Sequence, residues 1–326
     1  MRGSSDGRTG FERQLAELNA IRADPDEPGA AETLRAALAA NSNLLVARAA
    51  EIIGEWQLPG YTDRLADAFG RFLVDSARRD PTCAAKYAIA DTLNRLEVRD
   101  AELFLQGIRH VQMEPKWGGQ EDTAPPLRAV CAIGLARSDP PDTLLELARL
   151  LADPHADARI GAIRAIAYAA RPGGAPLLWY KAHLGDEETA VIYECFSAVL
   201  ALEPEAALLL VGERAAGGDA AQAEMAVLAL GSSRLAGALP LLIGLRATAG
   251  EPLLRRATLT AIATLGSDEA FNYLLGLLAD GSPADAADAL DALRLFREDE
   301  RRRRKVERVL RRRDDLPPGR SAYSTT

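Results

Sequence analysis

A chain of 326 residues would hold about two globular domains of average size. Hydrophobic residues make up 48% of it and aromatic residues only 5%, so much of the apolar content is alanine, which suits close helix packing and suits β-sheets poorly. With 39 basic and 47 acidic residues the net charge is −8, which disfavours a nucleic-acid binder because phosphate contacts need a basic surface.

The first 29 residues are expected to form a disordered N-terminus followed by a capping helix. Residues 1–10 are polar and lack the apolar core of a signal peptide. From Phe11 onward, Leu15 and Leu18 continue one apolar stripe, which predicts a helix that ends before Pro25. No apolar run approaches the length of a membrane span, and we expect a cytoplasmic protein.

Residues 30–296 repeat a short signature: a small residue, two other residues, a second small residue and then an aliphatic one. The aliphatic residue recurs eight times, at steps of 40, 42, 31, 33, 31, 32 and 31 residues: Ile53, Leu93, Leu135, Ile166, Val199, Leu230, Ile262 and Leu293. Such a period indicates helix pairs that bury their apolar faces only by stacking on their neighbours. The sequence therefore predicts an all-α protein, a right-handed α-solenoid (superhelix) of about eight antiparallel helix pairs.

One of these units resembles a known repeat. It opens with Asp153-Pro154, continues to Arg159 and ends on Ala165-Ile166. This pattern resembles the short HEAT-like repeat that is also found in phycobilin lyases. The resemblance implies a HEAT/armadillo-like fold and says little about activity, because such repeats serve many unrelated tasks. The richness in alanine and arginine suggests a bacterial source.

Four of the eight units carry a basic residue seven positions before the aliphatic one: Lys86, Arg128, Arg159 and Arg255. At the start of a second helix, such a residue can reach carboxylates in the connecting turns, among them Asp153, Asp157 and Asp186. We expect a structural Asp–Arg ladder that fixes the stacking of repeats, because charge ladders are mostly structural. A row of cations for an acidic partner is the alternative.

The sequence shows no catalytic constellation. Cys131 and Cys195 fall on the packed face and are expected to be buried, whereas Cys83 at a helix start is a site where a helix dipole could lower the thiol pKa. His155 lies in a turn beside Asp153 and Asp157; a helix cap is expected there, with a lone metal site as the alternative. We therefore expect no catalytic residues, no metal and no cofactor.

Residues 111–126 break the repeat. They contain three prolines and a Gly-Gly pair, which exclude one continuous helix. A tryptophan among polar residues, in a loop that leaves the repeat plan, is typical of a binding anchor. We expect a binding site here and at the start of the next helix, formed by Glu114, Trp117, Gln120, Asp122 and Arg128. The alternative is that Trp117 folds back and caps the hydrophobic core.

The C-terminal region differs sharply in charge from the rest of the chain. Residues 297–313 hold ten basic and four acidic residues and predict a basic helix that caps the solenoid. Docking onto RNA, an anionic membrane surface or an acidic protein is the alternative. Residues 314–326 are expected to be a flexible tail.

Taken together, these features predict a non-catalytic scaffold or regulator that binds a protein or peptide of unknown identity on the solenoid surface. Two alternatives from other classes remain. One is a bilin-lyase-like or other small-molecule-binding enzyme, acting as a lyase or isomerase. The other is nucleic-acid binding, which we consider only through the basic helix at 297–313.

Overall fold

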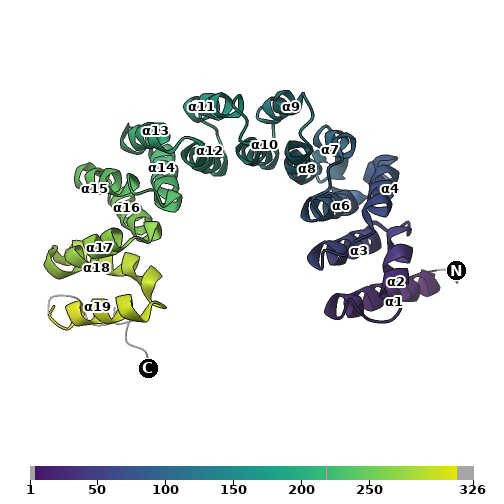
Figure 1. Ribbon diagram of the computed structural model, residues 1–326, viewed down its shortest axis with the longest axis horizontal. Helices are drawn as coiled ribbons and strands as arrows, with labels where there is room; N and C mark the ends of the chain where they lie inside the picture. Colours follow the sequence, from purple (N-terminus) through teal and green to yellow (C-terminus); the bar gives the residue numbers. More distant parts are fainter. Residues whose placement is uncertain (1–3, 218, 314–326) are drawn as a thin grey trace. The chain divides into compact units, whose positions relative to one another are not determined.

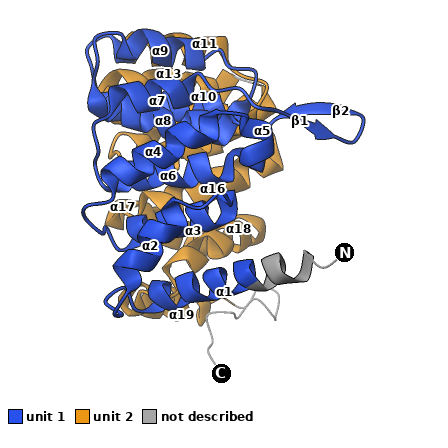
Figure 2. Cartoon of the chain, turned by 90° about the vertical axis from the view of Figure 1, so that its right-hand side faces the viewer, with its two compact units in different colours: residues 1–174 blue, residues 175–326 orange. Residues whose placement is uncertain are grey.

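The computed structural model describes residues 4–217 and 219–313, with side chains from residue 10 onward. Within them it has 19 α-helices, two short 3-10 helices and one two-stranded sheet, which confirms the all-α prediction. The chain divides into two compact units, residues 1–174 and 175–326 (Figure 2). The predicted tail at 314–326 lies outside the described residues.

Unit 1 consists of one terminal helix and four helix pairs. Its terminal helix α1 (Ser4–Ala23) begins earlier than the apolar stripe at Phe11 indicates. The pairs are α2 (Ala30–Leu38) with α3 (Asn43–Glu55), α4 (Thr62–Leu73) with α6 (Ala84–Arg95), α7 (Ala101–Ile108) with α8 (Pro125–Ser138), and α9 (Thr143–Leu150) with α10 (Ala156–Ala169). The second helices α3, α6, α8 and α10 pack in one row (Figure 1).

Unit 2 repeats this arrangement with four more pairs. They are α11 (Gly174–Leu184) with α12 (Thr189–Leu202), α13 (Pro204–Gly217) with α14 (Ala220–Ser233), α15 (Ala238–Thr248) with α16 (Pro252–Leu265), and α17 (Asp268–Asp280) with α18 (Pro283–Leu293). All eight aliphatic residues of the sequence signature lie on second helices and are at most 1% exposed. The predicted helix pairs are thus the building blocks of both units.

Small residues on the second helices allow neighbouring helices to approach closely. A Cβ atom on Gly161 of α10 would lie 2.3 Å from the Cα atom of Ala129 in α8, and one on Gly134 would lie 2.2 Å from the Phe104 ring. Real side chains do not tolerate such distances, so these positions require glycine. The buried apolar residues of α3, α6, α8 and α10 form the core between these helices.

Two insertions interrupt the regular pairs of unit 1. Helix α5 (Ser76–Arg79) and a 3-10 helix at Pro81–Cys83 lie between α4 and α6. Between α7 and α8, strands β1 (Met113–Lys116) and β2 (Gly119–Asp122) form an antiparallel hairpin that projects from the helices (Figure 2). These insertions account for the two long steps of the repeat. The sequence indicates an irregular segment at 111–126 but no strands.

Helix α19 (Glu300–Leu310) packs on α17 at the end of unit 2. Val306 is fully buried, and the Arg302 guanidinium lies over the rings of Phe271 and Phe296, 5.3 and 4.7 Å from their centroids. Arg302 also pairs with Asp268 at 2.9 Å, and this pair lowers the carboxyl pKa. The other face of α19 is solvent-exposed and includes Arg301, Arg304 and Arg308. No helix in the described part of the chain is long and apolar enough to span a membrane.

The close approach of α8 and α10 generates a prediction about stability. Gly161→Ala should lower the free energy of unfolding by about 1–3 kcal/mol, because the added methyl group overlaps backbone atoms of Ala129. Gly70→Ala is the matched control in α4, where a Cβ meets no atom within 4 Å, and it should stabilise by about 0.5–1 kcal/mol through helix propensity. Urea unfolding followed by circular dichroism measures both. Equal effects of the two substitutions on the free energy of unfolding would contradict the close contact between Gly161 and Ala129.

Candidate functional site

A buried arginine joins three segments of unit 1. The Arg128 side chain on α8 is only 4% exposed, and its Nη1 atom donates to Asp122 Oδ2 at 2.7 Å and to the His110 carbonyl oxygen at 2.9 Å. Its Nη2 atom donates to Asp153 Oδ1 at 3.1 Å, and its Nε atom lies 2.8 Å from Asp153 Oδ2. Arg128 therefore ties the end of the hairpin to the turn between α9 and α10.

Asp122 is held in place from both sides of the hairpin base. Its Oδ1 atom accepts hydrogen bonds from the backbone amides of Gln112 at 3.1 Å and Ala124 at 3.0 Å. Burial of the carboxyl opposes ionisation, but these two amides and Arg128 outweigh burial and lower the pKa of Asp122. The carboxylate is thus a fixed negative charge beside Arg128.

His155 stands at the entrance to this cluster. It precedes α10, and its amide donates to Asp153 Oδ1 at 2.9 Å. Its ring Nδ1 atom lies 3.3 Å from Asp153 Oδ1, 3.4 Å from Arg128 Nη2 and 4.0 Å from Asp122 Oδ2. The imidazole is 38% exposed, so one edge of the ring meets charged groups while part of it remains accessible.

A second charged cluster lies nearby. Glu146 on α9 is 7% exposed and accepts two hydrogen bonds from Arg109, from Nε at 3.1 Å and from Nη2 at 2.6 Å. Arg149 Nη1 donates to the same carboxylate at 2.5 Å. The bond from Arg109, with further help from Arg149, lowers the pKa of Glu146 against the opposing effect of burial.

The hairpin is latched to the helices by a network centred on Glu114. Its carboxylate accepts hydrogen bonds from the Thr82 amide and the Thr123 hydroxyl, both at 2.7 Å, and from Gln112 Nε2 at 2.5 Å. Burial raises the pKa of this carboxyl, but the three hydrogen bonds outweigh it and the net pKa is lowered. Gln112 is buried and also binds Lys86, which connects the latch to the core.

Lys86 is the buried counterpart of Arg128 in the preceding pair. Its ammonium group is fully buried and pairs with Asp80 Oδ2 at 2.9 Å. It also donates to the Phe72 carbonyl oxygen at 3.2 Å and to Gln112 Oε1 at 3.0 Å. All three donors of the ammonium group are therefore used inside the protein.

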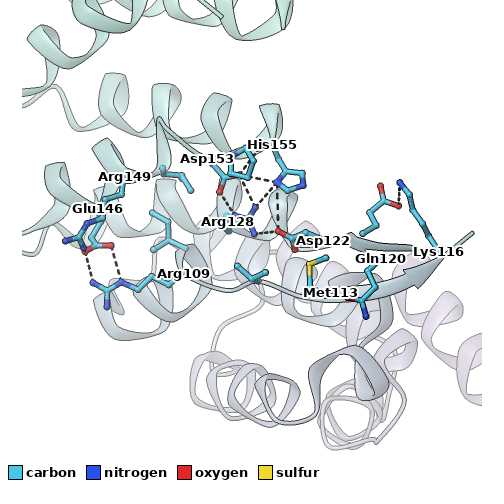
Figure 3. A pocket seen from close by; sticks show the side chains of 15 residues that line it. Arg109, Met113, Lys116, Gln120, Asp122, Arg128, Glu146, Arg149, Asp153 and His155 are labelled. Carbon is cyan, nitrogen blue, oxygen red and sulfur yellow. Dashed lines mark hydrogen bonds and ion pairs between the residues drawn. The ribbon is translucent and has the colours of Figure 1, made fainter. Parts of the chain in front are cut away.

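The Arg128 cluster and the Glu146 cluster border one pocket with a volume of about 630 Å³. Figure 3 shows Arg109, Glu146 and Arg149 at one end, Arg128, Asp153 and His155 in the middle, and the hairpin residues at the other end. The apolar part of the lining comes from Ile108, Val111, Met113, Leu150 and Pro154, while Lys116, Gln120 and Glu121 line it from the hairpin. The pocket combines an apolar surface with charged groups on both sides.

The structure brings some of the predicted binding residues together and separates others. Asp122, Arg128 and Gln120 line the pocket, whereas Glu114 latches the hairpin. Trp117 occupies the hairpin turn and is 93% exposed, so the alternative in which it folds back on the core is wrong. The following Gly118 has a φ of 83°, a conformation that glycine adopts without strain and that closes the two-residue turn.

The predicted ladder residues have different environments. Lys86 and Arg128 make the buried pairs described above, and Asp153 contacts Arg128 with its carboxylate. Arg159 donates to the backbone oxygen of Asp153 at 2.8 Å. Asp157 and Arg255 are exposed on α10 and α16, and Asp186 pairs with Lys181 at 2.6 Å.

The expectation of a lowered thiol pKa at Cys83 is wrong. The residue is 1% exposed, and burial raises its thiol pKa to about 11 despite the nearby Lys86. Cys131 and Cys195 are buried as expected. Among the described residues, no group of three or more His, Cys, Asp and Glu side chains is arranged to hold a metal ion; Asp122 and Asp153 pair with the guanidinium of Arg128 instead.

Sequence reasoning missed His155, Arg109, Glu146 and Arg149 as site residues. One signal was available: an aspartate stands six residues before the basic residue in three successive units, at Asp80, Asp122 and Asp153. That spacing marks the buried pairs of Lys86 and Arg128. No comparable signal links Arg109 to Glu146, which lie 37 residues apart.

No protein family model and no curated protein matches the chain. Among solved structures, it is similar to the complex of CpcE and CpcF of phycocyanin lyase from Nostoc, with 18% identity over 77% of this chain and 94% of the other, and a TM-score of 0.39. It is also similar to human deoxyhypusine hydroxylase in complex with glycerol, with 16% identity over 89% of this chain and 99% of the other, and a TM-score of 0.28. At these identities the likeness concerns the fold.

The prediction that the chain is not an enzyme is contradicted by this comparison, because both similar structures are of enzymes, a lyase and a hydroxylase. The prediction took the lack of a sequence motif as evidence against catalysis. The pocket instead gathers titratable side chains from the residue after α7, from the hairpin, from α8 and α9 and from the turn before α10, and residues so far apart in sequence form no motif.

The Glu114 latch generates a prediction about pH. Since its pKa is lower in the folded chain than the ordinary value of 4.5, ionised Glu114 stabilises the fold above that value, and the contribution is lost as the pH falls through the folded pKa. Glu114→Gln should therefore lower the free energy of unfolding at pH 7, and the difference from wild type should shrink below pH 4.5. Urea unfolding of both proteins at pH 7 and at a pH below 4.5 measures this difference.

Glu121→Gln is the control for this experiment. Glu121 is paired with Glu114 across the hairpin, is 54% exposed and makes only an ion pair with Lys116 at 3.3 Å among the described residues. Its substitution should have little effect at either pH, as is usual for exposed pairs. A Glu114→Gln effect that is no larger than that of Glu121→Gln would show that Glu114 does not hold the hairpin.

Proposed function

We propose that the pocket of unit 1 binds a small molecule and that His155 exchanges a proton with it, in a reaction of the lyase or isomerase type. The observation that carries the proposal is the position of the imidazole, against the Asp153 carboxylate and at the edge of a pocket of about 630 Å³. Phycobilin-lyase-like chemistry, which the sequence raises as an alternative, is one form of this proposal.

The environment of His155 supports a role in proton transfer. Histidine exchanges protons near neutral pH more readily than any other side chain. In the tautomer we propose, Nδ1–H donates to Asp153 and Nε2 keeps a lone pair that can accept a proton from a bound molecule. Asp153 is itself fixed by Arg128, so its carboxylate can hold the ring in one orientation.

The shape and lining of the pocket support binding of a small molecule. Its volume lies within the range of pockets that hold drug-sized ligands, and its lining combines five apolar side chains with ten polar or charged ones. Val111 and Met113 are 60% and 46% exposed there. A bound molecule would cover these apolar side chains and leave its polar groups beside His155 and Arg128.

The proposed tautomer can be observed directly. In wild type, ¹⁵N NMR of the ring nitrogens at pH 8 should show His155 with a protonated Nδ1 and an unprotonated Nε2. Asp153→Asn removes the carboxylate that accepts the Nδ1 proton and should shift the population toward the Nε2–H tautomer. His183, whose Nδ1 atom contacts a backbone oxygen at 3.0 Å in unit 2, serves as the internal control. An Nε2–H tautomer in the wild type would contradict the proposal.

A second function, binding of a protein or peptide partner, is favoured by Trp117. This tryptophan is 93% exposed at the tip of a hairpin whose base is fixed by Glu114 and Asp122. Exposed large aromatic side chains on rigid supports are typical anchors of protein interfaces. We propose that the hairpin tip contacts a partner protein, either as substrate or as regulator of the pocket.

Crosslinking tests this second function. A photoreactive phenylalanine at position 117 should give one discrete crosslinked protein in cells of the native host, because the anchor side chain inserts into the partner. The same group at position 180, where Tyr180 is 70% exposed in unit 2, is the control for random contacts. Crosslinks that are absent at 117, or identical at the two positions, would exclude the hairpin tip as a docking site.

A further inference from the structure

We infer that the ligand of the pocket carries a carboxylate group, which Arg109 and Arg149 bind at the end of the pocket away from the hairpin. This inference rests on the proposed function, since it concerns the chemical class of the bound molecule. It is carried by the arrangement of two half-exposed guanidinium groups around one nearly buried glutamate.

The two arginines retain hydrogen-bond donors that no described residue uses. A guanidinium has five N–H donors. Arg109 uses its Nε and Nη2 atoms on Glu146, and Arg149 uses Nη1 on the same carboxylate. The remaining donors are available at the pocket, because the side chains of Arg109 and Arg149 are 57% and 61% exposed and both line it.

Glu146 places the guanidinium groups without neutralising them. Its carboxylate is 7% exposed and lies beneath both arginines. Its lowered pKa keeps it ionised at neutral pH, so the cluster of three side chains carries a net charge of one positive unit. Two cations held at fixed positions by a buried anion cost little further ordering when an anionic group binds, and this preorganisation favours affinity.

The rest of the lining defines the body of the ligand. The pocket wall also includes Ile108 and Leu150, which adjoin Arg109 and Arg149 in the chain, and Val111 and Met113, which lead into the hairpin. Figure 3 shows the two charged clusters side by side along this surface. A molecule with a carboxylate at one end and an apolar body would place that body against these residues and its reactive part beside His155.

Carboxylate recognition fits this cluster better than recognition of a cation or a neutral group. The exposed donors belong to guanidinium groups, whose planar fork matches a carboxylate in two parallel hydrogen bonds. The acidic side chains of the pocket interior are already engaged: Glu146 by two arginines, and Asp122 and Asp153 by Arg128. A cationic ligand would therefore meet like charges at the end of the pocket that Arg109 and Arg149 form.

NMR titration with octanoate and its neutral isostere octanamide tests the inference on the full chain. Octanoate should bind about tenfold or more tightly than octanamide, because charge-assisted hydrogen bonds to two arginines are made only by the carboxylate. Arg109→Gln and Arg149→Gln should each reduce this preference, and the double variant should bring it to about one while octanamide binding is unchanged. Arg95→Gln, which removes an exposed arginine outside the pocket, should keep the full preference.

The possible outcomes separate this inference from the proposed function. Equal binding of the two probes, or a preference that survives the double variant, would overturn the carboxylate site and leave the pocket as a binding site. Failure of both probes to shift resonances of pocket residues would overturn the proposed binding function and the inference with it. Arg149→Lys keeps the charge but not the planar fork, and retention of the full preference in this variant would contradict recognition by bidentate hydrogen bonds.

Discussion

The buried guanidinium of Arg128 is the constraint on which the architecture of this site depends. A guanidinium group that is 4% exposed needs oppositely charged partners, since an unpaired buried charge costs several kcal/mol. Arg128 obtains its partners from Asp122 at the end of the hairpin, from the carbonyl group of His110 and from Asp153 in the next turn. These three segments are far apart along the chain, and the pairing holds them together at the rim of the pocket.

The site arises where an insertion interrupts a regular stack of helices. In the regular stack, closely packed small residues such as Gly161 bring second helices together. The hairpin between α7 and α8 adds a wall beside this stack, and the polar network of Glu114, Gln112 and Lys86 anchors that wall to the core. Rigid support for a surface-exposed functional segment is a general property of loops that carry binding residues. The regular stack supplies the frame, and the irregular segment supplies the chemistry.

Much of the fold follows from the sequence, because periodic burial leaves a periodic signal. The eight aliphatic residues are all on second helices and nearly inaccessible to solvent, as a constant repeat length implies. Asp122 and Arg128 were also expected in the site, from their places within the irregular segment and at the start of the next helix. His155 was not, because its relation to Asp122 depends on how one repeat stacks on the next. The strands at 113–122 were missed for a different reason: four-residue strands rich in charge and proline have no apolar alternation.

The central claim is that Arg128 couples the hairpin to the turn before α10, and amide hydrogen exchange in Arg128→Lys tests it most directly. A lysine keeps the positive charge but cannot bridge both carboxylates and the carbonyl group at once. We predict faster exchange than in wild type both at Gln112 and Ala124, whose amides bind Asp122, and at His155, whose amide binds Asp153, with no change in α14 and α16 of unit 2. Unchanged exchange, or a change confined to one of the two segments, would contradict the account.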